Sequence, residues 1–506
     1  MQFFAGPLKE LAEYEEIQKK RTEKQGMIQI SGCVTSQKTH LMYALGDGFK
    51  RKIIAVSSEL KAKQIYEEYR FLDSDVWIYP AKDLLFYQAD LRGKFLIKQR
   101  MEVYQALLEQ EQVTVITSFD GFMDSLLPLE EMEKRVISLE AGQELDFEKL
   151  KKDMVLLGYE REEQIEGPGQ FAVRGGILDI YPLTEEVPVR IEMWGDEIDS
   201  IRTFDVESQR SIENLESIRI YPATDFPEEQ AKRVSFLDYF DKKTSMLFLD
   251  EPVRLIEKGE SVEEEFVQAQ ANRMECGYAV SDEEMKLFST KEIADKMNQY
   301  YSIGMSALEM KCKEFKTRGL YHLQAKGVNP YNNSFEMLTR DLKQLKRKGY
   351  RAILLSGSRT RAKRLAEDLR DYNLSSFYSE DVEREVNPGE IMVTYGHVTE
   401  GYEYPMIKFI VISETDIFGQ KKKKRKRKVY EGQKIQSFSE LKVGDYVVHE
   451  NHGLGIYQGI EKIEVDKVSK DYMKIAYAAG GNLYIPATQL DLIQKYASAC
   501  LLYTSD

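Results

Sequence analysis

Hydrophobic and polar positions follow two different periods along this chain, and the period changes near residue 129. Before that point, apolar runs (MIQIS, KIIAVSS, VWIYP and VTVITS) are separated by segments whose apolar residues have helical spacing, around residues 59–71 and 95–108. Continuous apolar runs that alternate with amphipathic helices are typical of a parallel sheet covered on both faces. The pattern therefore predicts an α/β domain at the beginning of the chain.

From Leu129 to Ser211 the pattern changes to short alternating segments with turn signals every few residues. The stretch VRGGILDIYP, followed by VPVRIEMWGDEIDSIRTFDVESQRS, has turns marked by Gly175-Gly176 and Gly195-Asp196, which predicts a small sheet of short strands. From Ile218 the sequence again alternates between strand and helix candidates. The strand candidates are IRIYP and SMLFLD, and an acidic helical stretch covers residues 260–271. We interpret the β-rich stretch as a module inserted into the first α/β domain.

Two further regions follow. Residues 334–418 begin with an amphipathic helix, continue through AILLSGS, a helix and EIMVTYG, and close on FIVISETDIF, which predicts a second, smaller α/β domain. Residues 438–496 contain short strands with Gly-rich turns, which predicts a small β-barrel.

Composition and cysteine spacing bound the class of protein. At 506 residues, with 42% hydrophobic residues, the chain can form several domains of about 100–200 residues each. No apolar run reaches the roughly 20 residues of a membrane span, and the first 20 residues lack a signal-peptide pattern. The cysteines are far apart without any C-x-x-C pair, which argues against zinc and disulfides. We expect a cytoplasmic protein without a metal site. The cysteines are Cys33, Cys276, Cys312 and Cys500.

The net charge of −14 conceals a block of eight cations at residues 421–428 (KKKKRKRK), so the rest of the chain sums to −22. Such an acidic chain is a poor general ligand for nucleic-acid phosphates, which need clustered cations, and this favours protein partners. The block itself has three interpretations: a solvated linker, a contact with the DNA backbone, or a patch for another anionic partner. Its residues are Lys421, Lys422, Lys423, Lys424, Arg425, Lys426, Arg427 and Lys428.

A degenerate phosphate loop follows the first predicted strand, at Gly32-Cys-Val-Thr-Ser-Gln37-Lys38-Thr39. The pattern G-x-x-x-x-G-K-[ST] requires a second glycine so that backbone N–H groups can close around phosphate. Gln37 occupies that position here. The acidic residues after the next two strands, Glu59 and Asp120, fall in loops rather than at a magnesium position. We expect a loop kept for folding, with ATP binding as the alternative.

The β module resembles the second domain of the repair protein UvrB and, more closely, its counterpart in the transcription-repair coupling factor (Mfd) family. The resemblance implies binding of UvrA, and the family's contact positions fall on Arg174, Arg190 and Trp194, the last in place of an expected phenylalanine. Arg and Trp are favoured at the centres of protein interfaces. The alternative for Arg174 is an ion pair with Asp179 or Glu192 within the sheet.

The C-terminal segment VGDYVVHENHGLGIYQGIEKIEV, with DYMKIAYAAGGNLYIPATQL after it, resembles the CarD-like RNA-polymerase-interacting domain of the same family. The resemblance implies that an exposed edge strand pairs with the polymerase β subunit. The corresponding strand is Ile460–Val465, and its alternative is that Ile463 belongs to the core. The polymerase-facing positions are Ile460, Lys462, Ile463 and Val465.

Taken over the whole chain, the resemblance implies a multidomain α/β plus β fold. A degenerate RecA-like (P-loop-type) UvrB-like α/β domain is interrupted by the UvrA-binding module and followed by a small α/β domain and a CarD/Tudor-like barrel. The expected boundaries are 1–127, 128–212, 213–333, 334–418, a basic linker at 419–436, the barrel at 437–497 and a tail at 498–506. The last residues, CLLYTSD, match nothing expected after the barrel and suggest a truncation or sequencing scar.

The resemblance implies a role in transcription-coupled nucleotide-excision repair, as a scaffold that binds stalled RNA polymerase and recruits UvrA. In the family an ATP-dependent DNA translocase follows the barrel, and its motifs are missing from this sequence. We therefore expect no enzymatic activity and no cofactor here, with ATP and magnesium confined to the motor. We expect a monomer that contacts double-stranded DNA weakly or through that motor. The alternatives are a UvrB-like DNA-dependent ATPase or helicase and a CarD-like transcription regulator.

Overall fold

The computed structural model describes residues 2–82, 90–224, 233–275 and 287–419, and, nearer the C-terminus, residues 433–434, 444, 446–449, 453–465, 468–476, 482–486 and 493–495. The chain divides into two compact units, residues 1–421 and residues 422–506. Within the described ranges, every helix is too short or too polar to span a lipid bilayer.

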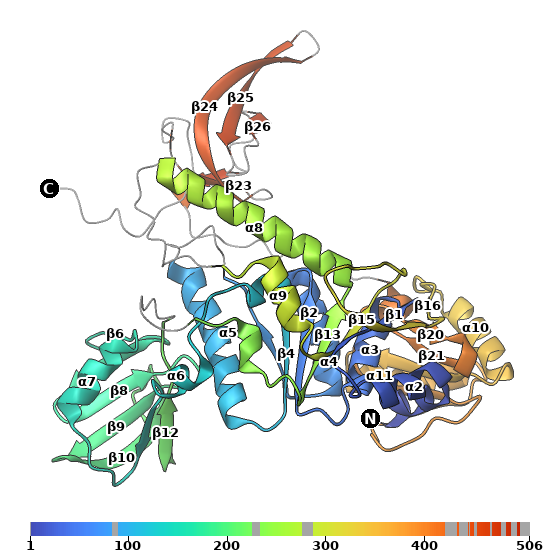
Figure 1. Cartoon of the computed structure of the whole chain (residues 1–506), viewed down its shortest axis with the longest axis horizontal. Coiled ribbons are helices and arrows are strands. Elements are labelled where there is room, and N and C mark those ends of the chain that lie inside the picture. Colours follow the sequence, from blue (N-terminus) through green and yellow to red (C-terminus); the bar gives the residue numbers. More distant parts are fainter. Residues whose placement is uncertain are drawn as a thin grey trace. The chain divides into compact units, whose positions relative to one another are not determined.

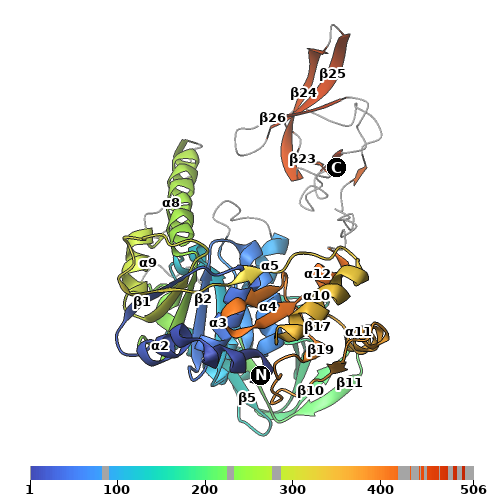
Figure 2. The ribbon, with the colours of Figure 1, turned by 90° about the vertical axis from the view of Figure 1, so that its right-hand side faces the viewer.

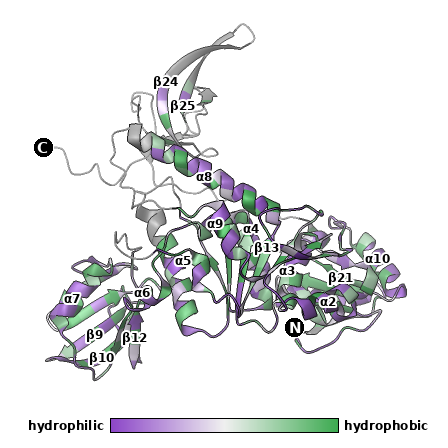
Figure 3. Ribbon diagram, viewed as in Figure 1, coloured by the Kyte–Doolittle hydropathy of each residue, from purple (hydrophilic) through white to green (hydrophobic). Residues whose placement is uncertain are grey.

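A fully parallel sheet forms the centre of the first unit. In the described part of that unit its seven strands have the order β15-β1-β14-β13-β2-β4-β3 (Figure 1). Most of its strands appear in the hydrophobic colours (Figure 3), as expected for a parallel sheet buried on both faces. The predicted parallel α/β domain is confirmed. The strands are β1 Gly26–Ser31, β2 Arg51–Val56, β3 Val76–Tyr79, β4 Val113–Ser118, β13 Ser245–Asp250, β14 Tyr301–Met305 and β15 Thr317–His322.

Helices cover both faces of this sheet. Ile54 and Val56 of β2 enter one core with α3 and α4, whereas Ile53 and Ala55 enter a second core with α5, α8 and α9, because successive strand residues point to opposite faces. The N-terminal helices α1 and α2 close the first of these cores. The helices are α1 Gln2–Ala5, α2 Ala12–Lys20, α3 Thr35–Leu45, α4 Glu59–Leu72, α5 Asp90–Glu109, α8 Pro252–Glu275 and α9 Thr290–Met297.

A β-rich module is inserted between β4 and β13. Its main sheet has, among the described residues, the strand order β11-β10-β9-β8-β7-β6, and helix α7 packs against one face of it. The short helix α6 connects the module to the α/β domain (Figure 1). The bounds are α6 Leu129–Glu133, β5 Ile137–Glu140, α7 Phe147–Leu156, β6 Glu160–Arg161, β7 Gln170–Arg174, β8 Ile177–Tyr181, β9 Val189–Trp194, β10 Glu197–Phe204, β11 Ser211–Leu215 and β12 Ser217–Ile220.

The segment IRIYP does not return to the α/β domain, contrary to the sequence interpretation. It forms β12, which pairs antiparallel with β5 at the start of the module. Ile218 and Ile220 of β12 pack in the core of the module. The two isoleucines of this strand show only that one side of it is buried, so the sequence did not reveal which sheet this strand joins.

The second α/β domain, around residues 326–418, places its sheet between two layers (Figure 2). Ile353 and Leu355 of β17 face the core shared with α3 and α4, whereas Ala352 and Leu354 face a separate core under α10 and α11. Among the described residues the strand order is β16-β20-β21-β17-β19-β18. The bounds are β16 Lys326–Gly327, α10 Phe335–Arg347, β17 Arg351–Ser356, α11 Arg359–Asp371, β18 Ser376–Tyr378, β19 Ile391–Tyr395, β20 Tyr402–Tyr404, β21 Phe409–Ile412 and α12 Glu414–Phe418.

The second unit contains an antiparallel sheet built around a long hairpin. Its described strands have the order β22-β27-β23-β24-β25-β26. Closure of this sheet into a barrel stays a prediction. The bounds are β22 Gln433–Lys434, β23 Tyr446–His449, β24 Gly453–Val465, β25 Val468–Ala476, β26 Asn482–Pro486 and β27 Ile493–Lys495.

Candidate docking site

One face of the module's sheet carries a cluster of two arginines around a single buried carboxylate. Asp179 is only 2% exposed, and its two oxygens accept hydrogen bonds from Arg190 Nε at 2.6 Å and Arg190 Nη2 at 2.9 Å. Arg174 Nη2 donates to the same carboxylate at 2.5 Å. The side-chain oxygen of Gln209 accepts a further hydrogen bond from Arg190 at 2.9 Å. The cluster keeps a net charge of +1.

Strand register explains why these side chains meet. Asp179 on β8 lies directly opposite Arg190 on β9, and directly opposed residues on neighbouring strands share one face of the sheet. Arg174 on β7 lies opposite Ile177, two residues from Asp179, so it reaches the carboxylate diagonally. The guanidinium of Arg190 also lies 4.4 Å from the centre of the Phe204 ring, which adds a cation–π contact.

Trp194 stands on the same face at the end of β9. Because side chains alternate along a strand, Arg190, Glu192 and Trp194 share one face of β9. Trp194 is 81% exposed, whereas the arginine cluster is anchored in the sheet. Glu192 forms an ion pair with Arg202 on β10, and Glu197 at the start of β10 lies opposite Trp194. We name the surface of Arg174, Arg190 and Trp194 the arginine–tryptophan face.

The structure shows the ion pair with Asp179 that was the alternative for Arg174, whereas a contact of Arg174 with UvrA stays a prediction. The ion pair with Asp179 exists, yet the Arg174 side chain remains 48% exposed and part of its guanidinium is available to a partner. Arg190 is more enclosed, with a side chain that is 13% exposed. Sequence reasoning did not foresee that Arg190 shares Asp179 or that Gln209 joins them. The signal for Asp179 was an acid inside the apolar strand ILDIY, since buried acids are rarely unpaired.

The degenerate phosphate loop is filled by the protein's own side chains. Lys38 is 5% exposed, and its ammonium donates to Asp250 at 2.7 Å and to Glu251 at 2.5 Å. Burial alone would lower the pKa of Lys38, but the two carboxylates outweigh this effect and raise its pKa above the ordinary value. The cation that would meet phosphate in an intact loop is thus neutralised from within.

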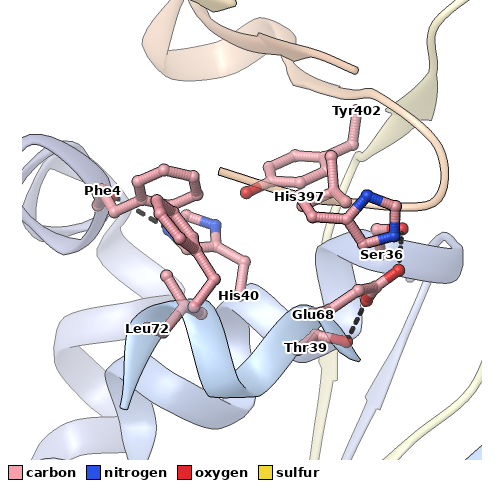
Figure 4. A pocket seen from close by; sticks show the side chains of 10 residues that line it. Phe4, Ser36, Thr39, His40, Glu68, Leu72, His397 and Tyr402 are labelled. Atoms are coloured by element: carbon pink, nitrogen blue, oxygen red, sulfur yellow. Dashed lines mark hydrogen bonds between the residues drawn. The ribbon is translucent and has the colours of Figure 1, made fainter. Parts of the chain in front are cut away.

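The hydroxyl groups beside Lys38 are also engaged, as Figure 4 shows. Ser36 and Thr39 donate to the two oxygens of buried Glu68 at 2.7 and 2.6 Å. From the second α/β domain, the backbone N–H groups of Thr399 and Glu400 donate to Glu68 and Ser36 at 3.0 and 3.1 Å. The cavity left between these groups measures about 10 Å³, enough for one water molecule and far too small for a nucleotide.

Gln37, at the position of the missing glycine, connects the two α/β domains. It is fully buried, and its Nε2 donates to the hydroxyl of Tyr404 at 3.0 Å. His40 Nε2 lies 2.9 Å from the carbonyl oxygen of Phe4, which only accepts, so Nε2 carries the proton and Nδ1 accepts from Tyr404 at 3.1 Å. Burial lowers the pKa of His40 to about 4, so this ring is neutral at pH 7.

The acidic partners of the loop were not those considered in the sequence. Glu59 begins α4 at the surface, and Asp120 pairs with Lys258 at 3.5 Å. Asp250 and Glu251, at the end of β13, take the place beside Lys38 instead. The strand order explains the difference, because β13 lies between β2 and β14 although it follows the inserted module in sequence. Gly32 has a φ of +76°, and a Cβ there would lie 2.0 Å from the oxygen of Leu323, so this glycine serves packing.

The remaining predicted positions lie in the second unit. Ile460, Lys462, Ile463 and Val465 belong to β24, whose backbone pairs with β25, with Ile463 opposite Lys470. The lysine block, from Lys422 onward in this unit and with Lys421 at the end of the first, lies outside the described residues. In the part of the chain that the structure describes, no three His, Cys, Asp or Glu side chains are grouped to hold a metal ion.

Comparisons with known families support the resemblance seen in the sequence. Residues 137–226 match the UvrB interaction domain, and residues 441–497 match the CarD-like/TRCF RID domain. The first match contains the arginine–tryptophan face, and the second contains β24.

Curated relatives carry one name, transcription-repair-coupling factor. The protein of Bacillus subtilis (strain 168) is 28% identical over 93% of this chain and 45% of its own length. Those of Staphylococcus epidermidis (strain RP62A) and Staphylococcus aureus (strain MRSA252) are each 26% identical over 84% and 85% of this chain and 41% of their own lengths. The chain thus spans less than half the length of these relatives. A hypothetical ATP-dependent RNA helicase from Sulfolobus tokodaii overlaps 78% of this chain and 82% of its own at 9% identity with a TM-score of 0.23, too loosely to bear on the fold.

Proposed function

We propose that this chain, a relative of the transcription-repair-coupling factors, is a docking scaffold in transcription-coupled nucleotide-excision repair. One end binds UvrA through the inserted module, and the other binds RNA polymerase through the CarD-like domain. The whole protein acts as an ATP-dependent DNA translocase through further domains that hold ATP and magnesium.

The arginine–tryptophan face carries the proposal for UvrA. Two guanidinium groups fixed on one buried carboxylate present their unused N–H donors with little loss of side-chain entropy on binding. The neighbouring Trp194 offers a large exposed ring, the residue type most enriched at interface hot spots. The residual charge of +1 favours an acidic patch on the partner.

The CarD-like domain supports the second contact. Strand β24 is 13 residues long, and the polymerase β subunit would pair with the part of this hairpin that contains Ile460–Val465. Strand addition supplies affinity through main-chain hydrogen bonds and selectivity through alternate side chains. In this proposal Ile463 is the apolar anchor.

The filled phosphate loop supports a role in docking rather than in catalysis for the first α/β domain. Lys38, Ser36 and Thr39 are all bonded to carboxylates of the protein, so a nucleotide would have to displace three buried interactions. We propose that this domain binds no ATP and that the chain acts as a monomer.

Pull-down of purified UvrA and of the polymerase β subunit tests the scaffold. Trp194→Ala should weaken UvrA binding about 30-fold, a loss of about 2 kcal/mol that is typical of an interface hot spot, and should leave polymerase binding unchanged. Ile463→Arg should do the reverse. Leu156→Ala is the matched control, because Leu156 is 72% exposed on α7, which packs against the other face of the module. If wild-type chain captures neither partner, the scaffold is wrong.

A DNA-stimulated ATPase assay tests the helicase alternative. The scaffold predicts no turnover above that of a Lys38→Met variant. Turnover by the wild-type chain that this variant abolishes would favour the UvrB-like ATPase instead. A regulator that acts through the CarD-like domain alone would leave the arginine–tryptophan face without a role.

A further inference from the structure

The outer helices of the second α/β domain concentrate positive charge in an otherwise acidic chain. Residues 334–371 contain eleven lysines and arginines against five aspartates and glutamates, a net charge of +6, whereas the whole chain carries −14. The rest of the same domain, residues 372–418, contains two basic and nine acidic residues. Charge is therefore segregated within this domain, and the two halves differ in sign.

Packing places this charge on one surface. Leu338 and Leu342 of α10 and Leu365 and Leu369 of α11 enter the same core beneath one face of β17. The opposite sides of both helices are exposed. The rings of Phe335 and Tyr372 contact each other with centroids 5.1 Å apart, and Lys346 donates to Ser375 at 2.9 Å, so the two helical segments adjoin.

Most cations on this surface have no acidic partner. The ion pairs of α10 and α11 involve Arg340, Arg359 and Arg361. Seven others form no ion pair in the described part of the chain, and we name them the basic face. Its residues are Lys343, Lys346, Arg347, Lys348, Lys363, Arg364 and Arg370.

The contacts that these seven side chains do make leave their charge uncompensated. Arg370 donates to the carbonyl oxygen of Ser376 at 3.0 Å, and Lys363 lies 5.3 Å from the centre of the Tyr378 ring. On α10, Lys343 and Arg347 are four residues apart, which places them on one side of the helix. Neither forms an ion pair in the part of the chain that the structure describes.

We propose that the basic face binds the phosphate backbone of double-stranded DNA without sequence preference. Duplex DNA presents one negative charge per about 1.7 Å of its axis, and each cation that neutralises a phosphate releases condensed counterions. The long lysine and arginine side chains of α10 and α11 can reach successive phosphates of such a backbone. This contact lies apart from the proposed docking of UvrA and polymerase and does not depend on either.

The composition of the surface favours duplex DNA over other anions. Single-stranded nucleic acid is held by several aromatic rings on which bases stack. The exposed large apolar side chains of α10, the end of α11 and the neighbouring end of α12 are Met337, Tyr372 and Phe418, of which Tyr372 already packs on Phe335. A protein interface would have an apolar centre, whereas the exposed residues of α10 and α11 are rich in lysine and arginine. Phosphates in a regular row fit the observed side chains best.

Fluorescence anisotropy with a labelled 30-base-pair duplex, measured from 50 to 200 mM salt, tests the proposal on the full chain. The variant K343Q/R347Q/K363Q/R364Q removes four cations of the basic face. We expect its slope of log affinity against log salt to be shallower than that of wild type by about 3 to 4, at about 0.9 per phosphate contact. Its affinity at 50 mM salt should fall at least about tenfold.

A matched control removes four exposed lysines of the first α/β domain, K243Q/K291Q/K311Q/K313Q, with the same change in net charge. This control should keep at least half of the wild-type affinity for DNA. If both variants lose the same affinity, net charge alone explains the binding and the proposal is overturned. A third variant, in which Lys421–Lys428 are neutralised, tests whether the basic linker makes the contact instead. If this variant loses all DNA binding and the variant of the basic face loses none, the contact lies in the linker. Equal competition by poly-glutamate, or tighter binding of single strands, would also overturn the assignment. The melting temperatures of the variants should match wild type.

Discussion

The arginine–tryptophan face and the filled phosphate loop both contain a cluster of shared ion pairs, but the ratio of cations to carboxylates is reversed between them. On the module, two arginines share one carboxylate, Asp179, at 2.5 and 2.6 Å. In the loop, one lysine shares two carboxylates, Asp250 and Glu251, at 2.7 and 2.5 Å. The first cluster keeps a charge of +1 and the second a charge of −1.

Exposure separates what the two clusters can do. The side chain of Arg174 is 48% exposed, and a guanidinium has five N–H donors, so the module keeps donors for a partner. The side chain of Lys38 is 7% exposed, and the second α/β domain covers the neighbouring hydroxyl groups. A buried carboxylate can therefore hold cations so that their remaining donors stay exposed, or it can neutralise a cation within the fold. The outcome depends on whether cations or carboxylates are in excess.

The largest expected effect comes from breaking the loop cluster. Lys38→Ala leaves buried Asp250 and partly buried Glu251 without their cation, and removal of one partner of a buried ion pair costs about 3–5 kcal/mol. Urea unfolding followed by circular dichroism measures the loss for the transition of the first α/β domain. Binding of UvrA should be unchanged at temperatures where the variant remains folded.

Lys313→Ala is the control for this experiment, because Lys313 is exposed and forms no ion pair in the described part of the chain. Substitutions at such surface positions usually stay within about 0.5 kcal/mol. A Lys38→Ala variant as stable as this control would contradict the structural role of the loop. In that case the comparison with the module would lose its basis.

A smaller effect should follow from Asp179→Asn on the module, and it should reach both stability and binding. The amide cannot neutralise Arg174 and Arg190, which then repel each other, so we expect a loss of about 2–3 kcal/mol in stability, below the full cost of breaking a buried pair because Arg174 is half exposed. UvrA binding measured by calorimetry should weaken at least tenfold at a temperature where the variant is folded.

The matched control is Glu192→Gln, which removes the ion pair with Arg202 between side chains that are 27% and 29% exposed. Partly exposed pairs contribute about 0.2–1 kcal/mol. If Asp179→Asn lowers stability but leaves UvrA affinity at the wild-type value, the carboxylate supports the sheet alone and does not orient the arginines.

Sequence patterns predicted the parallel α/β sheet because buried parallel strands and amphipathic helices have distinct local periods. They did not predict which distant strands meet. β12 was assigned to the wrong sheet, since its two isoleucines, Ile218 and Ile220, fit either one. The acids beside Lys38 come from β13, which returns to the sheet only after the inserted module.

The candidate site shows the same limit at the level of side chains. The loss of the second loop glycine at Gln37 was visible in the sequence, but its partner Tyr404 is 367 positions away. The neighbourhood of Arg174 and Asp179 followed from their spacing, whereas the shared pairing with Arg190 depended on the register of β8 and β9. Register is a property of the whole sheet, so no local pattern reports it.

The smallest expected effect is on the pH dependence of stability. It should appear at the filled phosphate loop, beside His40, without substitution of any residue in the two clusters. Unfolded histidine has a pKa of about 6.5, and burial lowers the pKa of His40, beside the filled loop, to about 4. Between these values the unfolded state binds more protons than the folded state, so stability is complete above about pH 6.5 and falls as the pH drops toward 4. The expected loss between pH 7 and pH 5 is about 2 kcal/mol.

Urea unfolding of wild type, His40→Gln and His397→Gln at pH 7 and pH 5 measures this contribution. His397 is an exposed histidine at the same pocket, and its variant is the matched control. His40→Gln should lose about 2 kcal/mol of the wild-type dependence on pH. Arginines stay protonated throughout this range, and the hydrogen bond to Asp179 raises the pKa of Arg190 further. Equal pH dependence in all three proteins would mean that other groups govern the acid response, and that the neutral ring of His40 does not hold Tyr404 against the loop.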